Sequence, residues 1–265
     1  MSKQKYTYDE IFQRNIGILS KSEQRKIKKT KILFVGCGGI GGWAAELLVR
    51  LGVGSVILAD PEEFEVSNLN RQATSTHKTI GLNKADTLGR YLKEINPYLN
   101  LKIVTEGITK NNISELLDST DFCVDTIDFY AIEDDIILHD AARRMEKKIF
   151  LAQVAGSKAT FTYFDSNCPP LSHFITRKNK ISMVRAIRFF FPELPKESSK
   201  LLINRIVRGQ KAVIPSYSVK PVITASLLVE DIIKFITNNE FYPVPSIGIY
   251  DFHDRTYKRV IKNGR

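Results

Sequence analysis

Cysteine is scarce in this chain of 265 residues, which contains only Cys37, Cys123 and Cys168. Three scattered cysteines cannot build the disulfide framework of a small secreted domain. No two of them are separated by two residues, so the chain lacks the CxxC pairs of a four-cysteine zinc site. We therefore expect reduced thiols, a cytoplasmic protein and no structural zinc.

Long apolar runs are also missing. No stretch reaches the roughly 20 apolar residues that a membrane-spanning helix needs. Residues 1–31 are polar and rich in lysine, without the apolar centre of a secretory signal. The sequence therefore predicts no membrane partner.

Acidic residues are under-represented in only one part of the chain. The formal net charge of +10 falls entirely on residues 168–265, which contain 17 Lys and Arg against 7 Asp and Glu. A basic surface there would favour an anionic partner such as nucleic acid, an acidic peptide or a phosphorylated metabolite. A solvated basic face explains the same count equally well, so both interpretations stay open.

Glycine, in contrast, is concentrated in the stretch KILFVGCGGIGGWAAELLVRLGVGSVILAD at residues 31–60. Its pattern is typical of a strand, a tight glycine turn, a helix and a second strand in a nucleotide-binding sheet. The missing side chains let phosphate oxygens approach the amides of the turn, and the helix points the positive end of its dipole at the anion. An acid at the end of the second strand can bind a ribose. The predicted nucleotide-binding residues of this stretch are Gly36, Gly38, Gly39, Gly41 and Asp60.

A long polar loop follows Asp60 and leads into a helix predicted over residues 82–95. Arg71 and Lys84 flank this loop, and Asn68 and Gln72 lie beside the first of them. If the loop folds back over the glycine turn, both cations reach the outer phosphates of a triphosphate. Taken alone, Lys84 fits a solvated helix lysine better.

The apolar strand in DFCVDTID ends on two acids, Asp125 and Asp128. Ligands of open α/β sheets bind beyond the carboxyl ends of the strands, so an acid there is a candidate for the site. Hard cations prefer carboxylate oxygens. We therefore expect Asp128 to hold Mg²⁺ against a triphosphate and Asp125 to cap a turn.

The order of these patterns predicts an α/β fold with a Rossmann-like, mostly parallel sheet flanked by helices. After residue 156 the strands alternate, which indicates antiparallel strands that extend the sheet in the C-terminal part. Helices around residues 181–191 and 198–207, a long apolar helix and a terminal hairpin follow. We expect a helical arm at residues 1–30, a nucleotide-binding part at 31–165, and a basic substrate or crossover part of the same domain at 166–265.

Several motifs occur together in a specific order and spacing. They are GCGGIGG, LAD with Glu62 close behind, SNLNRQ at residues 67–72, GLNKA at residues 81–85 and TID ending at Asp128, with FQRN in the N-terminal arm. With these motifs the chain resembles the ThiF/MoeB/HesA family, the prokaryotic relatives of ubiquitin-activating enzymes. The resemblance covers most of the chain and is strongest at residues 13–165.

The resemblance implies an ATP-dependent adenylyltransferase, which converts a carboxylate into an acyl-adenylate and releases pyrophosphate. The glycine amides would hold the phosphates, Asp60 the ribose and Asp128 the Mg²⁺. It also implies a homodimer in which Arg14 reaches the ATP site of the partner. The carboxylate would be the C-terminus of a ubiquitin-like sulfur carrier protein or a peptide. The triphosphate would be neutralised and oriented by Asn68, Arg71, Gln72 and Lys84.

Two departures from the family's pattern limit what the resemblance implies. The zinc-binding CxxC pairs of many members are absent, and only Cys168 lies near the crossover region, where thiolating members often carry a cysteine. The segment FYAIED after Asp128 lacks the asparagine and arginine usual in the family. The acyl substrate, and any second step after adenylation, therefore stay open.

Two alternative functions also fit the sequence. A tRNA-modifying adenylase of the threonylcarbamoyladenosine dehydratase type would suit the basic second part, with tRNA as the partner. An NAD-dependent oxidoreductase would suit GCGGIG followed by Asp60. Arg71, Lys84 and Asp128 favour ATP with Mg²⁺ over NAD, because a diphosphate without metal does not need them.

Overall fold

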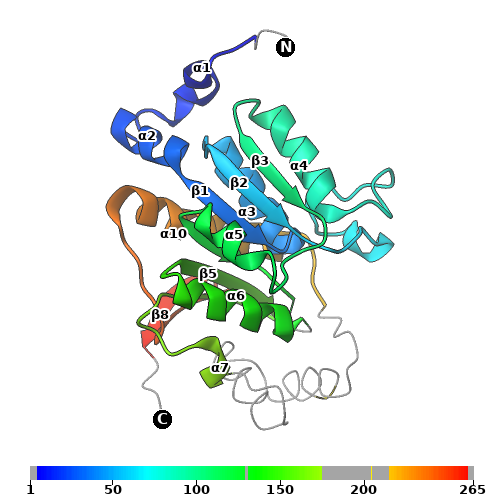
Figure 1. Ribbon diagram of the computed structural model, residues 1–265, viewed down its shortest axis with the longest axis vertical. Coiled ribbons are helices and arrows are strands. Elements are labelled where there is room, and N and C mark those ends of the chain that lie inside the picture. The colour runs from blue at the N-terminus through cyan, green and yellow to red at the C-terminus, as the bar shows by residue number, and fades with distance from the viewer. Residues whose placement is uncertain (1–4, 129–130, 175–203, 205–214, 262–265) are drawn as a thin grey trace.

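The chain folds around one eight-stranded sheet in the computed structural model, which describes residues 5–128, 131–174, 204 and 215–261 (Figure 1). The strand order is β3-β2-β1-β4-β5-β6-β7-β8. The strands are β1 (Lys31–Val35), β2 (Ser55–Ala59), β3 (Asn100–Val104), β4 (Phe122–Asp125), β5 (Lys148–Ala155), β6 (Lys158–Phe164), β7 (Ser246–Asp251) and β8 (Thr256–Ile261).

The first five strands pair in parallel and form the nucleotide-binding half of the sheet. The central strands are short apolar runs, because helices cover both faces of the sheet. Along β1, Ile32 and Phe34 belong to one core cluster, while Leu33 and Val35 belong to the cluster on the opposite face. The predicted Rossmann-like sheet is confirmed.

The last three strands run antiparallel: β6 pairs with β5, β7 with β6, and β8 with β7. β6 follows β5 through a tight connection at Gly156, whose φ of +60° suits a residue without a side chain. The predicted antiparallel extension of the sheet is therefore confirmed as well.

Helices cover both faces of the sheet. The core cluster on one face includes residues of α2, α3, α4 and α10, and the cluster on the other face includes residues of α5 and α6. Figure 1 shows α5 and α6 on the near side of the sheet, with α10 behind it. The helices of the described residues are α1 (Tyr8–Phe12), α2 (Lys21–Lys29), α3 (Gly39–Arg50), α4 (Lys84–Ile95), α5 (Ile113–Asp118), α6 (Ile132–Arg144), α7 (Leu171–Phe174) and α10 (Val219–Asn238), with short 3₁₀ helices η1 (Gln13–Asn15) and η2 (Val66–Asn68).

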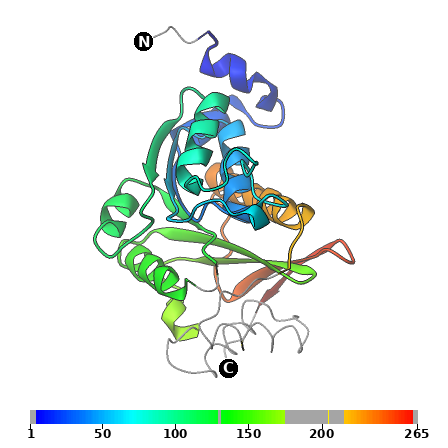
Figure 2. The ribbon, with the colours of Figure 1, turned by 90° about the vertical axis from the view of Figure 1, so that its right-hand side faces the viewer.

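The N-terminal arm, formed by α1, η1 and α2, packs against the C-terminal end of α3. Tyr8 Oη donates a hydrogen bond to Gly52 O at 2.6 Å, and Asn15 Nδ2 donates to Leu51 O at 3.2 Å. α3 has 12 residues and is therefore about 18 Å long. The arm thus lies about one helix length from the glycine turn, at the end of the molecule opposite α7 (Figure 2).

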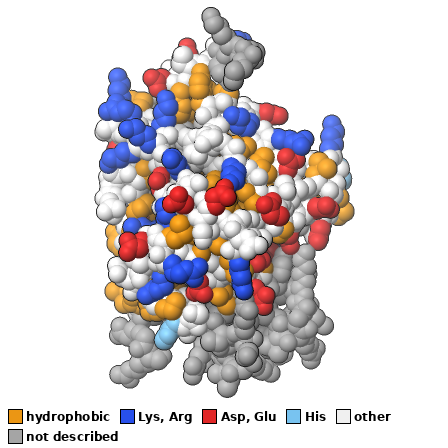
Figure 3. Space-filling model, in the orientation of Figure 1, with side chains coloured by type: hydrophobic (Ala, Val, Ile, Leu, Met, Phe, Trp, Pro, Cys, Tyr) orange, Lys and Arg blue, Asp and Glu red, His pale blue; other side chains and the backbone are white. Residues whose placement is uncertain are grey.

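Two sequence predictions fall wholly or mostly outside the described residues. The helices expected around residues 181–191 and 198–207 lie there, as do 12 of the 17 bases of residues 168–265. On the face drawn in Figure 3, basic and acidic side chains are interspersed over the described surface. Among the described helices, even the 20-residue α10 lacks the apolar character needed to span a bilayer.

Candidate nucleotide-binding site

A cavity of about 680 Å³ opens at the carboxyl ends of β1, β2, β4 and β5. Its volume is within the range of small-molecule sites. It lies where the strand order reverses between β1 and β4, which is where open α/β sheets bind ligands. The glycine turn, the loop after β2, the turn after β4, the end of β5 and residues 215–221 contribute to its wall.

The glycine turn lets β1 and α3 approach each other closely. Gly36 has a φ of +94°, and a Cβ there would lie 2.7 Å from the carbonyl oxygen of the turn after β4. A Cβ on Gly41 would lie 2.0 Å from Gly36 O. The close packing of the turn is therefore enough by itself to require a glycine at this position. Gly36, Gly38 and Gly39 line the cavity. A ligand therefore meets bare backbone at these three glycines.

The N-terminus of α3 supplies hydrogen-bond donors to this wall. Its N-cap is Gly38, which offers no side-chain cap to the first-turn amides. Such amides have no partner within the helix, and the positive end of the dipole adds to their attraction for an anion. The glycine turn is therefore suited to a phosphate group.

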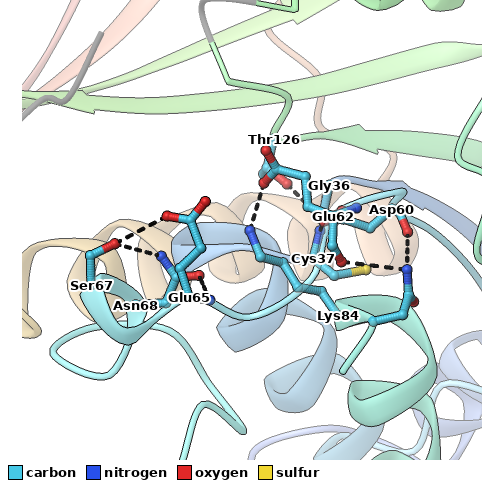
Figure 4. A network of polar contacts seen from close by, with 10 residues as sticks. Gly36, Cys37, Asp60, Glu62, Glu65, Ser67, Asn68, Lys84 and Thr126 are labelled. Carbon is cyan, nitrogen blue, oxygen red and sulfur yellow. Dashed lines mark hydrogen bonds and ion pairs between the residues drawn. The ribbon is translucent and has the colours of Figure 1, made fainter. Parts of the chain in front are cut away.

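The Asp60 carboxylate holds the glycine turn through hydrogen bonds to the main chain (Figure 4). Its Oδ2 accepts a hydrogen bond from Cys37 N at 2.6 Å, and its Oδ1 accepts one from Glu62 N at 2.8 Å. Burial raises the pKa of this carboxyl, against the opposing effect of the two amides. Asp60 also lines the cavity, so a ribose hydroxyl would use the remaining lone pairs of the two oxygens. The sequence predicted that Asp60 binds the ribose, but it did not predict that Asp60 also holds the glycine turn.

Lys84 is the first residue of α4 and lies in the wall of the cavity. Its Nζ is 2.6 Å from Glu62 Oε2, and its side chain is only 5% exposed (Figure 4). The prediction from the sequence alone, that Lys84 is a solvated helix lysine, is therefore wrong. A buried cation at a helix N-terminus opposes the helix dipole. An anion in the cavity would offset that cost. The sequence marked Glu62 as a motif residue but did not predict that it pairs with Lys84.

The loop after β2 folds back over the glycine turn. Trp43 of α3 donates from Nε1 to Arg71 O at 3.0 Å, which holds the loop against the helix. The Arg71 guanidinium donates to Ser67 O at 2.8 Å and to Asn70 Oδ1 at 3.0 Å. Arg71 and Lys84 thus line one cavity, as the folded-back loop predicted.

The side-chain amides of Asn68 and Gln72 in this loop add polar groups to the wall of the cavity. Asn68 is 5% exposed, and its Oδ1 accepts from Glu65 N at 3.0 Å. The side-chain amide of Gln72 lies 3.7 Å from the position of a Cβ on Gly38. Gln72 Oε1 is buried and has no hydrogen-bond partner in the described part of the chain. Both side chains line the cavity.

The turn after β4 carries Asp128 into the cavity wall. Asp125 holds this turn: its Oδ1 accepts from Ile127 N at 3.1 Å, and its Oδ2 lies 2.8 Å from His139 Nε2. The turn-capping role expected for Asp125 is present in the structure. His139 lies 14 residues away on α6, and nothing local in the sequence pointed to this contact.

Magnesium would need few ligands from the protein here. Mg²⁺ at a nucleotide site is held by one or two carboxylates together with the phosphates. Asp128 offers such an oxygen at the cavity wall. Among the described residues, no three or more His, Cys, Asp and Glu side chains converge to hold a metal on their own. The donor set therefore fits an ion shared with a nucleotide.

Arg14 lies on the exposed surface of η1. The arm is at the C-terminal end of α3, whereas the cavity is at its N-terminal end. A separation of about 18 Å along the helix exceeds the reach of an arginine side chain. Arg14 can therefore serve a cavity of this kind only in a second copy of the chain.

Cys168 is a buried structural cysteine. Its Sγ donates to Asp165 Oδ1 at 3.2 Å, and the residue as a whole is 4% exposed. Burial raises the pKa of the thiol to about 12. A nucleophilic cysteine needs the opposite shift, so this environment does not activate Cys168.

Comparison with known proteins identifies a matching family. The sequence profile of the ThiF family matches residues 12–263. The sulfur carrier protein ThiS adenylyltransferase of Bacillus subtilis is 32% identical over 170 residues, which are 63% of this chain and 49% of that protein. The tRNA threonylcarbamoyladenosine dehydratase of Escherichia coli is 35% identical over 98 residues, which are 37% of each protein. The chain spans about half the length, or less, of the curated relatives it matches.

A solved structure has the same fold. The crystal structure of E. coli MccB with MccA-N7isoASN matches with a TM-score of 0.67 and 20% identity, covering 90% of this chain and 66% of that one. At this identity the likeness concerns the fold alone. The family profile, in contrast, covers nearly the whole sequence and includes every motif of the cavity wall. The chain belongs to the ThiF family.

Proposed function

We propose that this chain is an ATP-dependent adenylyltransferase that activates a carboxylate as an acyl-adenylate and releases pyrophosphate. The observation that carries this proposal is the buried Lys84, which shares one cavity with the glycine turn and Arg71. The diphosphate of NAD would need the glycine turn but not two further cations. Membership of the ThiF family supports the same activity.

The proposed reaction needs no general base. A carboxylate oxygen of the substrate attacks the α-phosphorus of ATP and forms a new P–O bond. The bond from that phosphorus to the bridging oxygen breaks, and pyrophosphate leaves. Because the carboxylate is already an anion, catalysis consists of bringing two negative reactants together and neutralising charge.

Each cavity residue has a proposed role in this reaction. The amides of Gly38 and Gly39 would bind the phosphates, and Asp60 would bind the ribose. Mg²⁺, held by Asp128 and the phosphates, would neutralise part of the charge of the leaving pyrophosphate. The triphosphate would be oriented by Asn68, Arg71, Gln72 and Lys84.

We further propose that the enzyme is a homodimer and that Arg14 of one subunit completes the cavity of the other. The charge of the cavity supports this. Among the described residues that line it, two are bases, against six acids, namely Asp60, Glu62, Glu65, Glu106, Asp128 and Asp134. The described wall of one subunit therefore carries a net negative charge, and an arginine from a second subunit would add a cation for the triphosphate. We also place the protein in the cytoplasm, because its three cysteines are unpaired.

The proposed acyl substrate is the C-terminus of a carrier protein or peptide. The name of the B. subtilis relative describes an enzyme that adenylates a sulfur carrier protein. A second candidate is a tRNA-modifying adenylase, because another relative is a tRNA threonylcarbamoyladenosine dehydratase. Strongly salt-dependent binding of tRNA would favour this second candidate, and no binding at low salt would remove it.

Substrate-dependent exchange of labelled pyrophosphate into ATP tests the proposal. Exchange requires reversible formation of an adenylate, so a panel of carrier proteins, peptides and tRNA should contain a member that drives it in the presence of Mg²⁺. The Lys84→Ala variant is the control for contaminating enzymes. Absence of exchange across the panel, together with a change in nicotinamide absorbance, would favour the oxidoreductase instead.

A further inference from the structure

One wall of the cavity has no role in the binding of ATP described above. It is the end of β5, where Ala152, Gln153 and Val154 line the cavity. Gln153 is 8% exposed, and its Oε1 has no hydrogen-bond partner among the described residues. Buried amide oxygens are almost always paired in native proteins, so this one requires an explanation.

The described residues around Gln153 do not supply the missing donor. Its neighbour across the antiparallel pair is Thr160 of β6. Thr160 is 2% exposed, and its Oγ1 is also without a partner in the described part of the chain. Since Gln153 lines the cavity, a ligand can provide the donor.

The position of Gln153 in the sheet indicates which part of the ligand supplies the hydrogen-bond donor. Asp60 follows β2, and the order β2-β1-β4-β5 places β5 three strand spacings, or about 14 Å, from the proposed ribose site. Asp125 of β4 lies beside Leu151 of β5. Continuing this register places Gln153 beside the turn that carries Asp128. Gln153 therefore lies away from the proposed ribose site, so its hydrogen-bond donor belongs to another part of the reacting ligands.

We propose that Gln153 Oε1 accepts a hydrogen bond from the main-chain N–H of the last residue of the acyl substrate. This inference rests on the proposed function and specifies the substrate it takes. Every peptide C-terminus except one that ends in proline carries such an N–H, whatever its side chain. A simple aliphatic carboxylate has no donor at this position. The enzyme would thus select a peptide tail and reject a tail that ends in proline or an N-methylated residue.

Three stable mimics of the acyl-adenylate test this contact without turnover. They are sulfamoyl adenosines that carry an acetylglycyl, an acetylsarcosyl or a 4-oxopentanoyl group, so that an N–H is present, methylated or replaced by CH₂. Isothermal titration calorimetry on the full chain gives their affinities. We expect the acetylglycyl compound to bind roughly 10-fold to 100-fold more tightly than the other two, because only it satisfies the buried oxygen.

Variants at this position identify the acceptor. Gln153→Leu removes the oxygen and should bind the acetylglycyl and 4-oxopentanoyl compounds equally. Gln153→Glu retains an acceptor and should keep the preference for N–H. If Gln153→Leu fails to fold, Gln153→Met serves as the apolar variant. Thr160→Val is the matched control, since it removes the neighbouring buried hydroxyl and should leave the preference unchanged.

The possible results distinguish this inference from the function on which it rests. Equal affinity of the wild-type chain for the three compounds would contradict the role of Gln153, while tight binding itself would still support adenylation. A preference for N–H that persists in the apolar variant would also contradict it. If none of the three compounds binds, the proposed adenylation is wrong, and the inference is wrong with it.

Discussion

Lys84 Nζ lies 2.6 Å from Glu62 Oε2, and this ion pair joins the N-terminus of α4 to the loop after β2 at the wall of the cavity. The lysine side chain is almost fully buried, while Glu62 remains 35% exposed. A cation fixed in this way needs no reorganisation when a phosphate arrives. Preorganised charge of this kind is the largest contribution to many enzymatic rate enhancements.

Removal of Lys84 should therefore impair catalysis more than folding. We expect Lys84→Ala, and likewise Arg71→Ala, to lower kcat by roughly 10²–10³, which is the usual loss for one such donor. Rates of pyrophosphate exchange with the active substrate measure the effect, and thermal unfolding shows whether each variant is folded. Near-unchanged turnover in both variants would contradict the assignment.

Lys102 provides the matched control for Lys84. Its Nζ is 2.7 Å from Glu115 Oε1, in an ion pair whose two side chains are 49% and 73% exposed. Exposed pairs of this kind contribute about 0–1 kcal/mol to stability. Lys102→Ala should therefore leave both the exchange rate and the melting temperature close to those of the wild-type chain.

The proposed role of Arg14 in a second subunit predicts complementation between two inactive variants. In the proposed dimer, each site contains Lys84 of one chain and Arg14 of the other chain. Arg14→Ala and Lys84→Ala therefore remove residues that the two chains contribute to the same site. A heterodimer that carries one substitution on each chain retains one intact site of two, so it should recover about half of the wild-type exchange rate. Co-purification through two different tags isolates this heterodimer. A heterodimer as inactive as its parents would contradict the proposal.

The buried thiols predict a cysteine-independent first step. Burial raises the pKa of Cys168 to about 12, so the thiolate is scarce at neutral pH. Cys168→Ser should retain adenylate formation within a factor of about 3, and a thiol reagent should modify Cys37, Cys123 and Cys168 only after denaturation. Rapid modification of the native chain at Cys168 would contradict the buried position of this thiol.

Asp135 predicts a specific dependence of stability on pH. Burial raises its pKa well above the usual value, and the charges of Asp125, Asp134 and Asp128 raise it further. Because the native state holds this proton more tightly than the unfolded state, the stabilisation is complete below the unfolded pKa of about 3.9 and is lost as the pH rises through the native pKa. Each unit of elevation corresponds to about 1.4 kcal/mol.

Asp135→Asn removes this titration. The melting temperature of the variant should equal that of the wild-type chain near pH 4 and exceed it increasingly towards pH 8. Calorimetric unfolding over this range measures the difference, and the exposed Asp118→Asn provides the control. A difference that stays constant or shrinks with rising pH would contradict the buried position of Asp135.

The sequence predicted the parts of the fold that local patterns determine. The apolar runs of β1 and β2 and the glycines between them specify a strand, a turn and a helix within 30 residues, so the parallel sheet followed from them. The contact between Asp125 and His139 depends instead on the packing of α6 against the sheet. No period or motif in the sequence encodes that packing.

In the candidate site, too, local patterns predicted some features, whereas others depend on how the elements pack. Its motif residues meet in one cavity because they follow strands whose carboxyl ends share an edge of the sheet. The burial of Lys84 could not be predicted, because a solvated lysine at a helix start has the same local sequence. Gln153 was missed for a related reason: its exposure to the cavity depends on the pairing of β5 with β4 and β6.

Transfer of isotope from the substrate to AMP tests the central claim most directly. The substrate that drives exchange is labelled with ¹⁸O in its carboxylate and incubated with ATP, Mg²⁺ and hydroxylamine, which cleaves the acyl-adenylate at its carbonyl carbon. If the carboxylate attacks the α-phosphorus, mass spectrometry will find one ¹⁸O in AMP and none in orthophosphate. Label in orthophosphate, or AMP without label, would contradict adenylation at this site.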